Sequence, residues 1–461
     1  MTTYKNFTKV QQLVGKGFAF NWEAHPGAID RISFDSEVAK KIGAVNRTGA
    51  SAIINRPPRA TTTLTTLGGD YSLPGTTQPL VAYQAMSDAP VTLKVTVRAE
   101  LNLQTSVEEL ALNNDMAMVK RKVAQFTNNF RNKVTADFHL KMLAQTPQIT
   151  TQGTSYTTFG GNFMAGLGNA KGQMQYRNGI YANQNDLVLV VDPMLPGWVN
   201  ASGAQNTFHF GVGLDEAQKE GRLQARNGGF EAFSSPLVGG IALPIQLTDS
   251  VTSTAAFGYD GLTAVQTLDG DGNPGCAFVD TLSLALTGAI SGTVIKAGTA
   301  IYAATSTEID WIQPDTGVGI GIQWTGSVTD DATVAGDTTV TLNIKGAPIV
   351  TGPYKNVTAT AAIPIGTKFK IAGAGVAAKT QLMGLGFAPD AYAAVSPDIL
   401  IPGSGKSIEI LDELEFGNGF KVVIAQSVWP GTFQAAIKIF GFYGLVAQKE
   451  EAAIKYLYAL A

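Results

Sequence analysis

Residues 116–145, MAMVKRKVAQFTNNFRNKVTADFHLKMLAQ, contain neither glycine nor proline. Asn114 and Asp115 precede them with short polar side chains that can cap the first N–H groups of a helix, and Pro147 cannot continue one. Apolar residues return every three or four positions and so share one side of an α-helix: Val119, Val123, Phe126, Phe130, Val134, Phe138 and Met142. We therefore predict one helix about 45 Å long, at about 1.5 Å per residue, crossing a whole domain.

The other faces of this predicted helix are basic. One acid, Asp137, stands against six bases: Lys120, Arg121, Lys122, Arg131, Lys133 and Lys141. Two interpretations are open, a solvated helix face or a face turned toward a polyanion. The whole chain has a net charge of −3, so any affinity for DNA has to be local.

Composition limits the class of protein. The 461 residues are 45% apolar and only 15% charged, with 51 glycines, which is typical of a folded, β-rich protein of two or three domains with large protein interfaces. One cysteine, Cys276, excludes an intramolecular disulfide. The start lacks the apolar core of a signal peptide, and no run of about 18 apolar residues predicts a membrane span. We expect a chain that is made and kept in a cytoplasm, or in a particle assembled there.

The N-terminal third predicts extended segments that need neighbours. Residues 1–55 carry too few apolar residues in register for a core of their own, apart from a short helix at 35–42 capped by Asp35 or Ser36. Residues 56–92 are rich in Pro, Gly and Thr and predict a long hairpin or extended loop. Residues 91–101 alternate apolar and polar side chains, which predicts a strand leading toward the long helix.

The rest of the chain predicts an α+β domain that a β-rich segment interrupts. We expect a second helix at 158–177, a buried strand at 186–191 and short helices near 194–200 and 214–221. From 248 to 375 helix signals vanish, and short strands between turns predict a small barrel or sandwich: 282–286, 293–295, 301–304, 319–324, 339–344, 357–361 and 368–371. Two strands, 420–426 and 432–440, and a final helix at 448–460 complete the prediction.

Motifs for catalysis or ligand binding are incomplete. His25, His139 and His209 lie far apart and outside any catalytic motif. The Gly-Lys-Ser at 405–407 resembles the end of a phosphate-binding loop, but the required first glycine is Leu400. Residues 269–273, DGDGN, resemble a calcium loop, but Pro274 replaces the turn glycine and Asp280 the closing Glu. We therefore predict no catalytic, cofactor-binding or metal site, no cofactor, and no enzyme.

The order of these elements resembles the major capsid (coat) proteins of tailed bacteriophages, with the Hong Kong 97 fold. Residues 91–101 with 116–143 are similar to the loop strand and spine helix of that family. Residues 266–273 (QTLDGDGN) with 293–304 resemble the start of the inserted β domain in coat proteins of short-tailed phages. Residues 416–426 (FGNGFKVVIAQ) through 437–444 (IKIFGFYG) resemble the family's last strand pair.

This resemblance implies an α+β capsid fold with six parts. They are an N-terminal arm (1–55), an extended loop (56–92), a peripheral domain with the spine helix (93–146), the first part of an axial domain (147–247), an inserted small β-barrel (248–375) and a returning axial and peripheral part (376–461).

The function that the resemblance implies is structural. The chain would self-assemble into hexamers and pentamers of an icosahedral head around double-stranded DNA, held by non-specific charge contact. Scaffolding and portal proteins would be partners, and procapsid maturation would follow. The location would be the virion, assembled in the host bacterial cytoplasm, with no membrane. The alternative is a β-rich phage tail or adhesin-type protein that binds ligands through residues 248–375.

Overall fold

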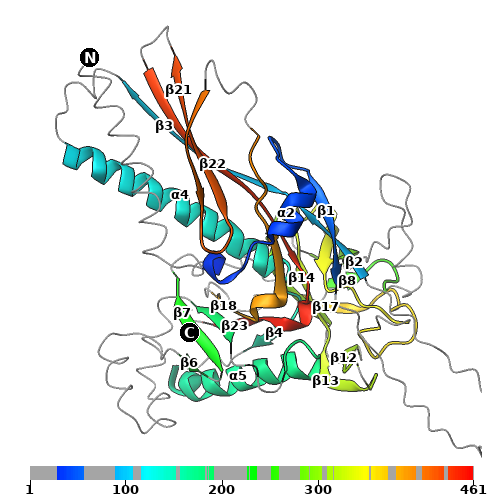
Figure 1. The fold of residues 1–461 in the computed structure, drawn as a ribbon. Helices are drawn as coiled ribbons and strands as arrows, with labels where there is room; N and C mark the ends of the chain where they lie inside the picture. The colour runs from blue at the N-terminus through cyan, green and yellow to red at the C-terminus, as the bar shows by residue number, and fades with distance from the viewer. Residues whose placement is uncertain are drawn as a thin grey trace, which may run out of the picture.

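The computed structural model describes residues 28–56, 89–106, 116–151, 156–181, 184, 186–191, 226–227, 229–235, 251–258, 281–289, 291–303, 309–314, 316–351, 355–371, 381–400, 408–429 and 434–459. These residues form a mixed, strand-rich α+β structure, as predicted. Figure 1 shows three parts: a long sheet with one long helix beside it, a second sheet that we call the body, and a small barrel. Among the described residues, no helix is long and apolar enough to cross a membrane.

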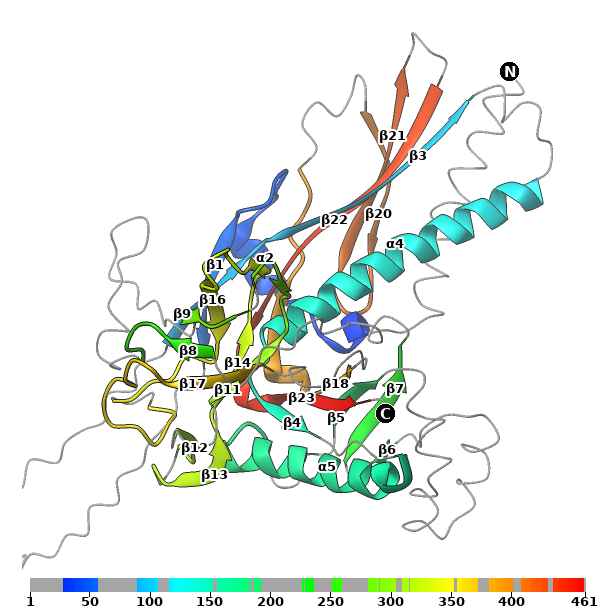
Figure 2. The ribbon, with the colours of Figure 1, turned by 180° about the vertical axis from the view of Figure 1, so that it is seen from behind.

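The predicted long helix is confirmed as α4 (Met116–Ala144). It lies beside the long sheet of β19 (Tyr392–Val395), β22 (Gln434–Ala447), β21 (Lys421–Trp429) and β20 (Ile408–Glu415), in that order, with β3 (Val97–Ser106) on the other side of β22 (Figure 2). Phe130, Val134, Phe138 and Met142 are buried, so the C-terminal part of the predicted apolar stripe faces the core.

The strand predicted at 91–101 is in fact two strands. β2 (Ala89–Lys94) pairs with β1 (Ser51–Arg56), whereas β3 pairs with β22. The chain changes partner at Val95, whose N–H donates to Ala50 O, and Thr96, whose N–H donates to Tyr443 O. Beside β1 lies α2 (Ser36–Ile42), whose N-cap Asp35 accepts from the N–H groups of residues 37 and 38. Of the hairpin or loop predicted at 56–92, residue 56 belongs to β1 and residues 89–92 to β2, which pair antiparallel, and 57–88 lie outside the described residues.

The body is a sheet of β4 (Ile149–Thr151), β23 (Ala453–Ala459), β18 (Gln381–Phe387), β5 (Leu187–Val191), β7 (Phe230–Ser234) and β6 (Arg226–Asn227), in that order. The predicted second helix is α5 (Tyr156–Tyr176), and the buried strand predicted near 186–191 is β5, buried at every residue. The 3-10 helix η1 (Ala28–Arg31) packs on α4. Another, η3 (Pro389–Ala391), precedes β19. The short helices predicted at 194–200 and 214–221 lie outside the described residues.

The helix predicted at 448–460 is wrong. Only the 3-10 turn η4 (Glu450–Ala452) is helical, and Ala453–Ala459 form β23. This strand pairs with β18 over seven residues and with β4 on its other edge. Buried sheet contacts on both sides therefore override the local helix propensity.

The barrel closes in the order β11 (Ala300–Ala303), β14 (Thr325–Val328), β16 (Val340–Lys345), β9 (Thr281–Thr287), β8 (Val251–Ser253) and β17 (Lys368–Ile371). Two small pairs flank it: β10 (Val294–Ile295) with β15 (Ala332–Thr333), and β12 (Asp310–Ile312) with β13 (Gly319–Gln323). Trp324 and Phe369 lie in a core separate from that of the body. The strand predicted at 357–361 is wrong, because Val357 makes only an isolated bridge to Trp311.

Candidate interaction site

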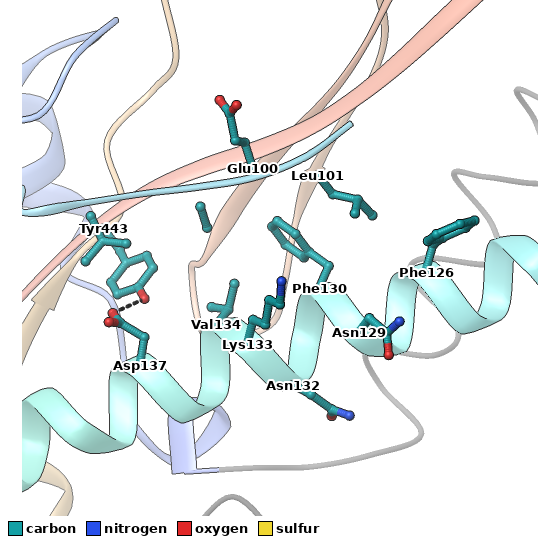
Figure 3. A pocket seen from close by; sticks show the side chains of 12 residues that line it. Glu100, Leu101, Phe126, Asn129, Phe130, Asn132, Lys133, Val134, Asp137 and Tyr443 are labelled. Atoms are coloured by element: carbon teal, nitrogen blue, oxygen red, sulfur yellow. Dashed lines mark hydrogen bonds between the residues drawn. The ribbon is translucent and has the colours of Figure 1, made fainter. Parts of the chain in front are cut away.

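A groove runs between α4 and β3, and we call it the α4–β3 groove. Its volume is about 530 Å³. The wall on α4 carries Phe126, Asn129, Phe130, Asn132, Lys133, Val134 and Asp137, and the other wall Val97, Ala99, Leu101 and Tyr443, together with Glu100, whose side chain points away from α4 (Figure 3). The groove is therefore apolar along most of its length, with a few charged or polar groups.

The helix wall of the groove changes from buried to exposed along α4. Phe130 is only 3% exposed, whereas Phe126, one turn nearer the helix N-terminus, is 40% exposed. On the opposite wall Val97, Ala99 and Leu101 pack only partly against the core. The structure thus leaves an apolar aromatic side chain at the open end of the groove, where exposed aromatic surface favours a binding partner.

Tyr443 and Asp137 form a fixed polar contact at the closed end of the groove. The Tyr443 hydroxyl donates to Asp137 Oδ2 at 2.6 Å (Figure 3). Burial, and then the charge of Asp137, raise the pKa of Tyr443 above its usual value, so the hydroxyl keeps its proton. This hydrogen bond joins α4 to β22 and fixes one end of the groove.

The two outer edges of the long sheet differ. Among the described residues β3 pairs with β22 alone and keeps an unbroken register from Val97 to Ser106. At the other edge, β20 carries an irregularity between Ile410 and Asp412, and Glu413 and Glu415 are exposed on it. Bulges and charges are the devices that protect an edge strand from pairing. β20 has both, whereas β3 carries charges on one face but has no bulge.

The face of β3 that points away from the groove is charged. Glu100 forms ion pairs with Arg98 at 2.9 Å and with Lys438 on β22 at 3.2 Å. Burial raises the pKa of Glu100, but hydrogen bonds from Lys438 and Asn102 outweigh it and hold the pKa below its usual value. β3 is therefore polar on one face and apolar on the groove face.

The contact between barrel and body, the barrel–body junction, is closed by buried charges. Lys345 on β16 pairs with Glu450 at 3.4 Å, and both side chains are almost fully buried. Arg177 pairs with Glu451 at 3.8 Å, and its guanidinium lies 3.7 Å from the centre of the Trp311 ring. These contacts join two hydrophobic cores that are otherwise separate.

Hydrogen bonds complete the junction. Lys455 Nζ donates to Gly298 O at 2.6 Å, and burial lowers the pKa of this lysine well below its usual value. Ser327 Oγ donates to Leu143 O at 3.0 Å, and Thr325 Oγ1 donates to Pro147 O at 2.7 Å. The barrel therefore sits directly on the C-terminal end of α4.

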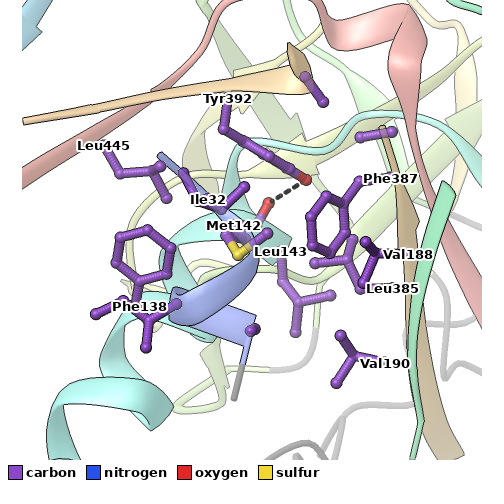
Figure 4. Packing of buried hydrophobic residues seen from close by; sticks show 14 of the residues in the cluster. Ile32, Phe138, Met142, Leu143, Val188, Val190, Leu385, Phe387, Tyr392 and Leu445 are labelled. Atoms are coloured by element: carbon purple, nitrogen blue, oxygen red, sulfur yellow. Dashed lines mark hydrogen bonds between the residues drawn. The ribbon is translucent and has the colours of Figure 1, made fainter. Parts of the chain in front are cut away.

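The apolar core beside this end of α4 is continuous with the body. Phe138 and Met142 pack with Val190, Leu385 and Phe387 of the body strands in one cluster (Figure 4). The Tyr392 hydroxyl lies 3.5 Å from Met142 O, to which it donates. The C-terminal half of α4 is thus held by the body and the barrel together.

The basic face predicted for α4 is not uniform. The prediction that Arg131 belongs to this basic face is wrong, because its side chain is buried and pairs with Asp30 of η1 at 3.1 Å. Arg121 and Lys133 are exposed, as predicted. Arg131 could not be assigned from the sequence, because its partner lies 101 residues away and no local spacing points to it.

In the part of the chain that the structure describes, the residues considered for catalysis or metal binding do not come together in a site. His139 is buried, and burial lowers its pKa to about 4. The described residues contain no group of three or more His, Cys, Asp or Glu side chains that could hold a metal ion. His25, His209, Cys276 and the segments 269–280 and 405–407 lie outside the described residues.

The sequence did not predict the α4–β3 groove, because its two walls come from segments that are separate in the chain.

Comparisons with known proteins give weak structural likenesses. A structure titled "Mycobacterium phage Che8" is 10% identical over 94% of this chain and 91% of that chain, with a TM-score of 0.41. The bacteriophage PhiM1 mature capsid is 9% identical over 90% and 85%, with a TM-score of 0.38. A virus-like particle from Pyrococcus furiosus is 6% identical over 97% of both chains, with a TM-score of 0.35. No family model and no curated protein matches.

Proposed function

We propose that this chain is the repeating subunit of a phage capsid shell. The supporting observation is the arrangement of α4 along the long sheet, with the body at its C-terminal end and the barrel set into the chain between body strands β7 and β18. This is the arrangement that the sequence resemblance to Hong Kong 97-type coat proteins implies. In this proposal the shell is icosahedral, built from hexamers and pentamers, and encloses double-stranded DNA in the virion.

The proposal assigns roles to the parts. Residues 1–55 and 56–92 are the arm and the loop that reach neighbouring subunits, and 248–375 is the inserted barrel. Residues 93–146 form the peripheral domain, and 147–247 with 376–461 form the axial domain and the rest of the peripheral one. A scaffolding protein directs assembly in the host cytoplasm, with a portal at one vertex. The exposed Arg121 on α4, outside the groove lining, supplies charge for non-specific contact with DNA.

Sedimentation and electron microscopy of the full chain, alone and with the scaffolding protein of its phage, test the proposal. Closed shells or rings of five and six subunits are expected. A stable monomer or trimer under both conditions would overturn it and favour the alternative of a tail or adhesin-type protein. That alternative then predicts ligand binding by the barrel.

A further inference from the structure

We propose that residues 18–22 of a second copy of this chain pair with the edge of β3 that no described strand covers, and place their aromatic side chains in the α4–β3 groove. This inference rests on the proposed function, since it names a contact between shell subunits. It is carried by three features: the edge of β3, which has no bulge and no second partner strand among the described residues, the groove beside that strand, and the alternation of aromatic residues in 18–22.

The edge of β3 can accept a strand. Its backbone pairs with β22 over ten residues without an irregularity, and within the described residues its other side pairs with nothing. β3 contains no proline, which would remove a backbone N–H donor from its edge. An added strand gains a ladder of main-chain hydrogen bonds, which is the usual way in which a sheet edge binds an extended peptide. The bulged and acidic edge at β20 does not offer such a ladder.

The groove fixes the side-chain pattern of the added strand. Side chains of β3 alternate between the groove (Val97, Ala99 and Leu101) and the charged outer face (Arg98 and Glu100). A strand beside β3 continues the same pleat, so every second side chain enters the groove. There it meets the exposed ring of Phe126, which the described part of the chain leaves half uncovered. The occupant is therefore an extended segment with large apolar residues at alternate positions.

This chain carries such a segment. Phe18, Phe20 and Trp22 alternate with Ala19 and Asn21. Three aromatic rings on one face of a strand suit the apolar groove, and five residues span about 17 Å at 3.3–3.4 Å per residue. The helix wall from Phe126 to Asp137 has a similar length, about 18 Å at 1.5 Å per residue.

The position of Ala28 favours a second copy over the same chain. The η1 helix lies at the turn between β20 and β21, where Asn418 Nδ2 donates to Ile29 O at 2.9 Å and Phe34 N–H donates to Asn418 O. That turn is at the β20 side of the long sheet, opposite β3. The same η1 helix packs on α4, where Asp30 pairs with Arg131 at 3.1 Å, and Arg131 is not part of the groove lining. The chain preceding Ala28 thus starts across α4 from the edge of β3, whereas a segment of a second copy needs no crossing of α4 to reach that edge.

Mixed disulfide crosslinking tests the pairing. All chains carry Cys276→Ser; one population carries Asn21→Cys, and a second, differently tagged population carries Arg98→Cys, Glu100→Cys or Asn102→Cys, one at a time. The two populations are mixed before assembly. We expect dimers with both tags for at least one of these outward-facing β3 positions, at least tenfold above the matched control Ala99→Cys, which faces the groove.

Three outcomes would overturn the inference: shells without mixed dimers, equal crosslinking at Ala99→Cys, or, in a chain with both cysteines, crosslinks within one chain only. Failure of the proposed function is distinct, because then no shells are seen by electron microscopy.

A pair of helix variants supplies a second readout. Phe126→Asp alters the exposed groove residue, and Leu140→Asp is its control on the same helix, 38% exposed and outside the groove lining. We expect Phe126→Asp to yield at least tenfold fewer shells with an unchanged urea transition, and Leu140→Asp to assemble. Normal assembly of Phe126→Asp, or equal loss in both variants, would contradict the proposal.

Discussion

The barrel–body junction lies at the C-terminal end of α4 and the α4–β3 groove along its middle, and the two are built in opposite ways. At the junction, charged side chains such as Lys345 and Glu450 are buried and paired. At the groove, the helix leaves the sheet, and an aromatic side chain stays exposed. A closed contact fixes two parts of one chain, whereas an open apolar contact leaves surface for another molecule.

Glycine shows how close the surfaces are at the junction. A Cβ at Gly346, where φ is +86°, would overlap the ring of Pro147. Pro147 belongs to the body side and Gly346 to the barrel. At the groove, by contrast, the walls are far enough apart to leave a volume of about 530 Å³.

The largest effect is expected from breaking the buried pair at the junction. Lys345→Ala leaves the Glu450 carboxylate buried without this cation, and we expect a loss of about 3–5 kcal/mol in the free energy of unfolding. Urea unfolding of the full chain measures it. The double variant Lys345→Met with Glu450→Gln removes both charges and should recover part of the loss. A single variant with wild-type stability would show that the junction does not hold the barrel.

The contrast along α4 is tested by two Phe variants one turn apart. Phe130→Ala empties a buried site and should cost about 3–5 kcal/mol. Phe126→Ala changes an exposed ring and should cost less than about 1 kcal/mol. Denaturant unfolding of the two full-length variants compares them directly. Equal losses would mean that Phe126 is covered within the subunit, and the open end of the groove would then be misassigned.

The sequence predicted the parts of the fold whose contacts repeat locally. The period of α4 placed Phe130, Val134, Phe138 and Met142 in the core, and Asp35 marked the start of α2. It failed where a distant segment decides the outcome. β23 is a strand because β18 and β4 flank it, and Arg131 is buried because Asp30 reaches it. The groove belongs to this second kind, since β3 and α4 form it only after β3 has paired with β22.

A smaller effect of pH is expected from His139 on the buried side of α4. Its pKa is about 4 in the folded chain, below the usual 6.5, because burial disfavours the charged form. The unfolded chain therefore binds the proton first, and stability present above pH 6.5 is lost as the pH falls toward 4. The maximum contribution is about 3 kcal/mol, at about 1.4 kcal/mol per unit of pKa.

Urea unfolding between pH 7 and pH 4 measures this contribution, with His139→Gln as the comparison. The variant lacks the titrating ring but keeps the carboxylates that also titrate at low pH. Its stability should therefore fall less steeply between pH 6.5 and 4 than that of the wild type. If the stability of both proteins falls equally with pH, the titration of His139 does not contribute to the loss of stability at low pH.

The smallest effect is expected at an ion pair on the barrel surface. Lys296 Nζ lies 2.6 Å from Asp331 Oδ2, a shorter distance than that between Lys345 and Glu450, but both side chains are about half exposed. Hydrogen bonds from Lys296 and from the N–H of Ala297 hold the pKa of Asp331 below its usual value. Water screens exposed pairs, so Lys296→Ala should cost less than about 1 kcal/mol, and less still at high salt. Measured beside Lys345→Ala, this variant separates burial from distance as the source of the junction's strength. A loss at Lys296 as large as that at Lys345 would show that the two pairs do not differ in the way that their burial predicts.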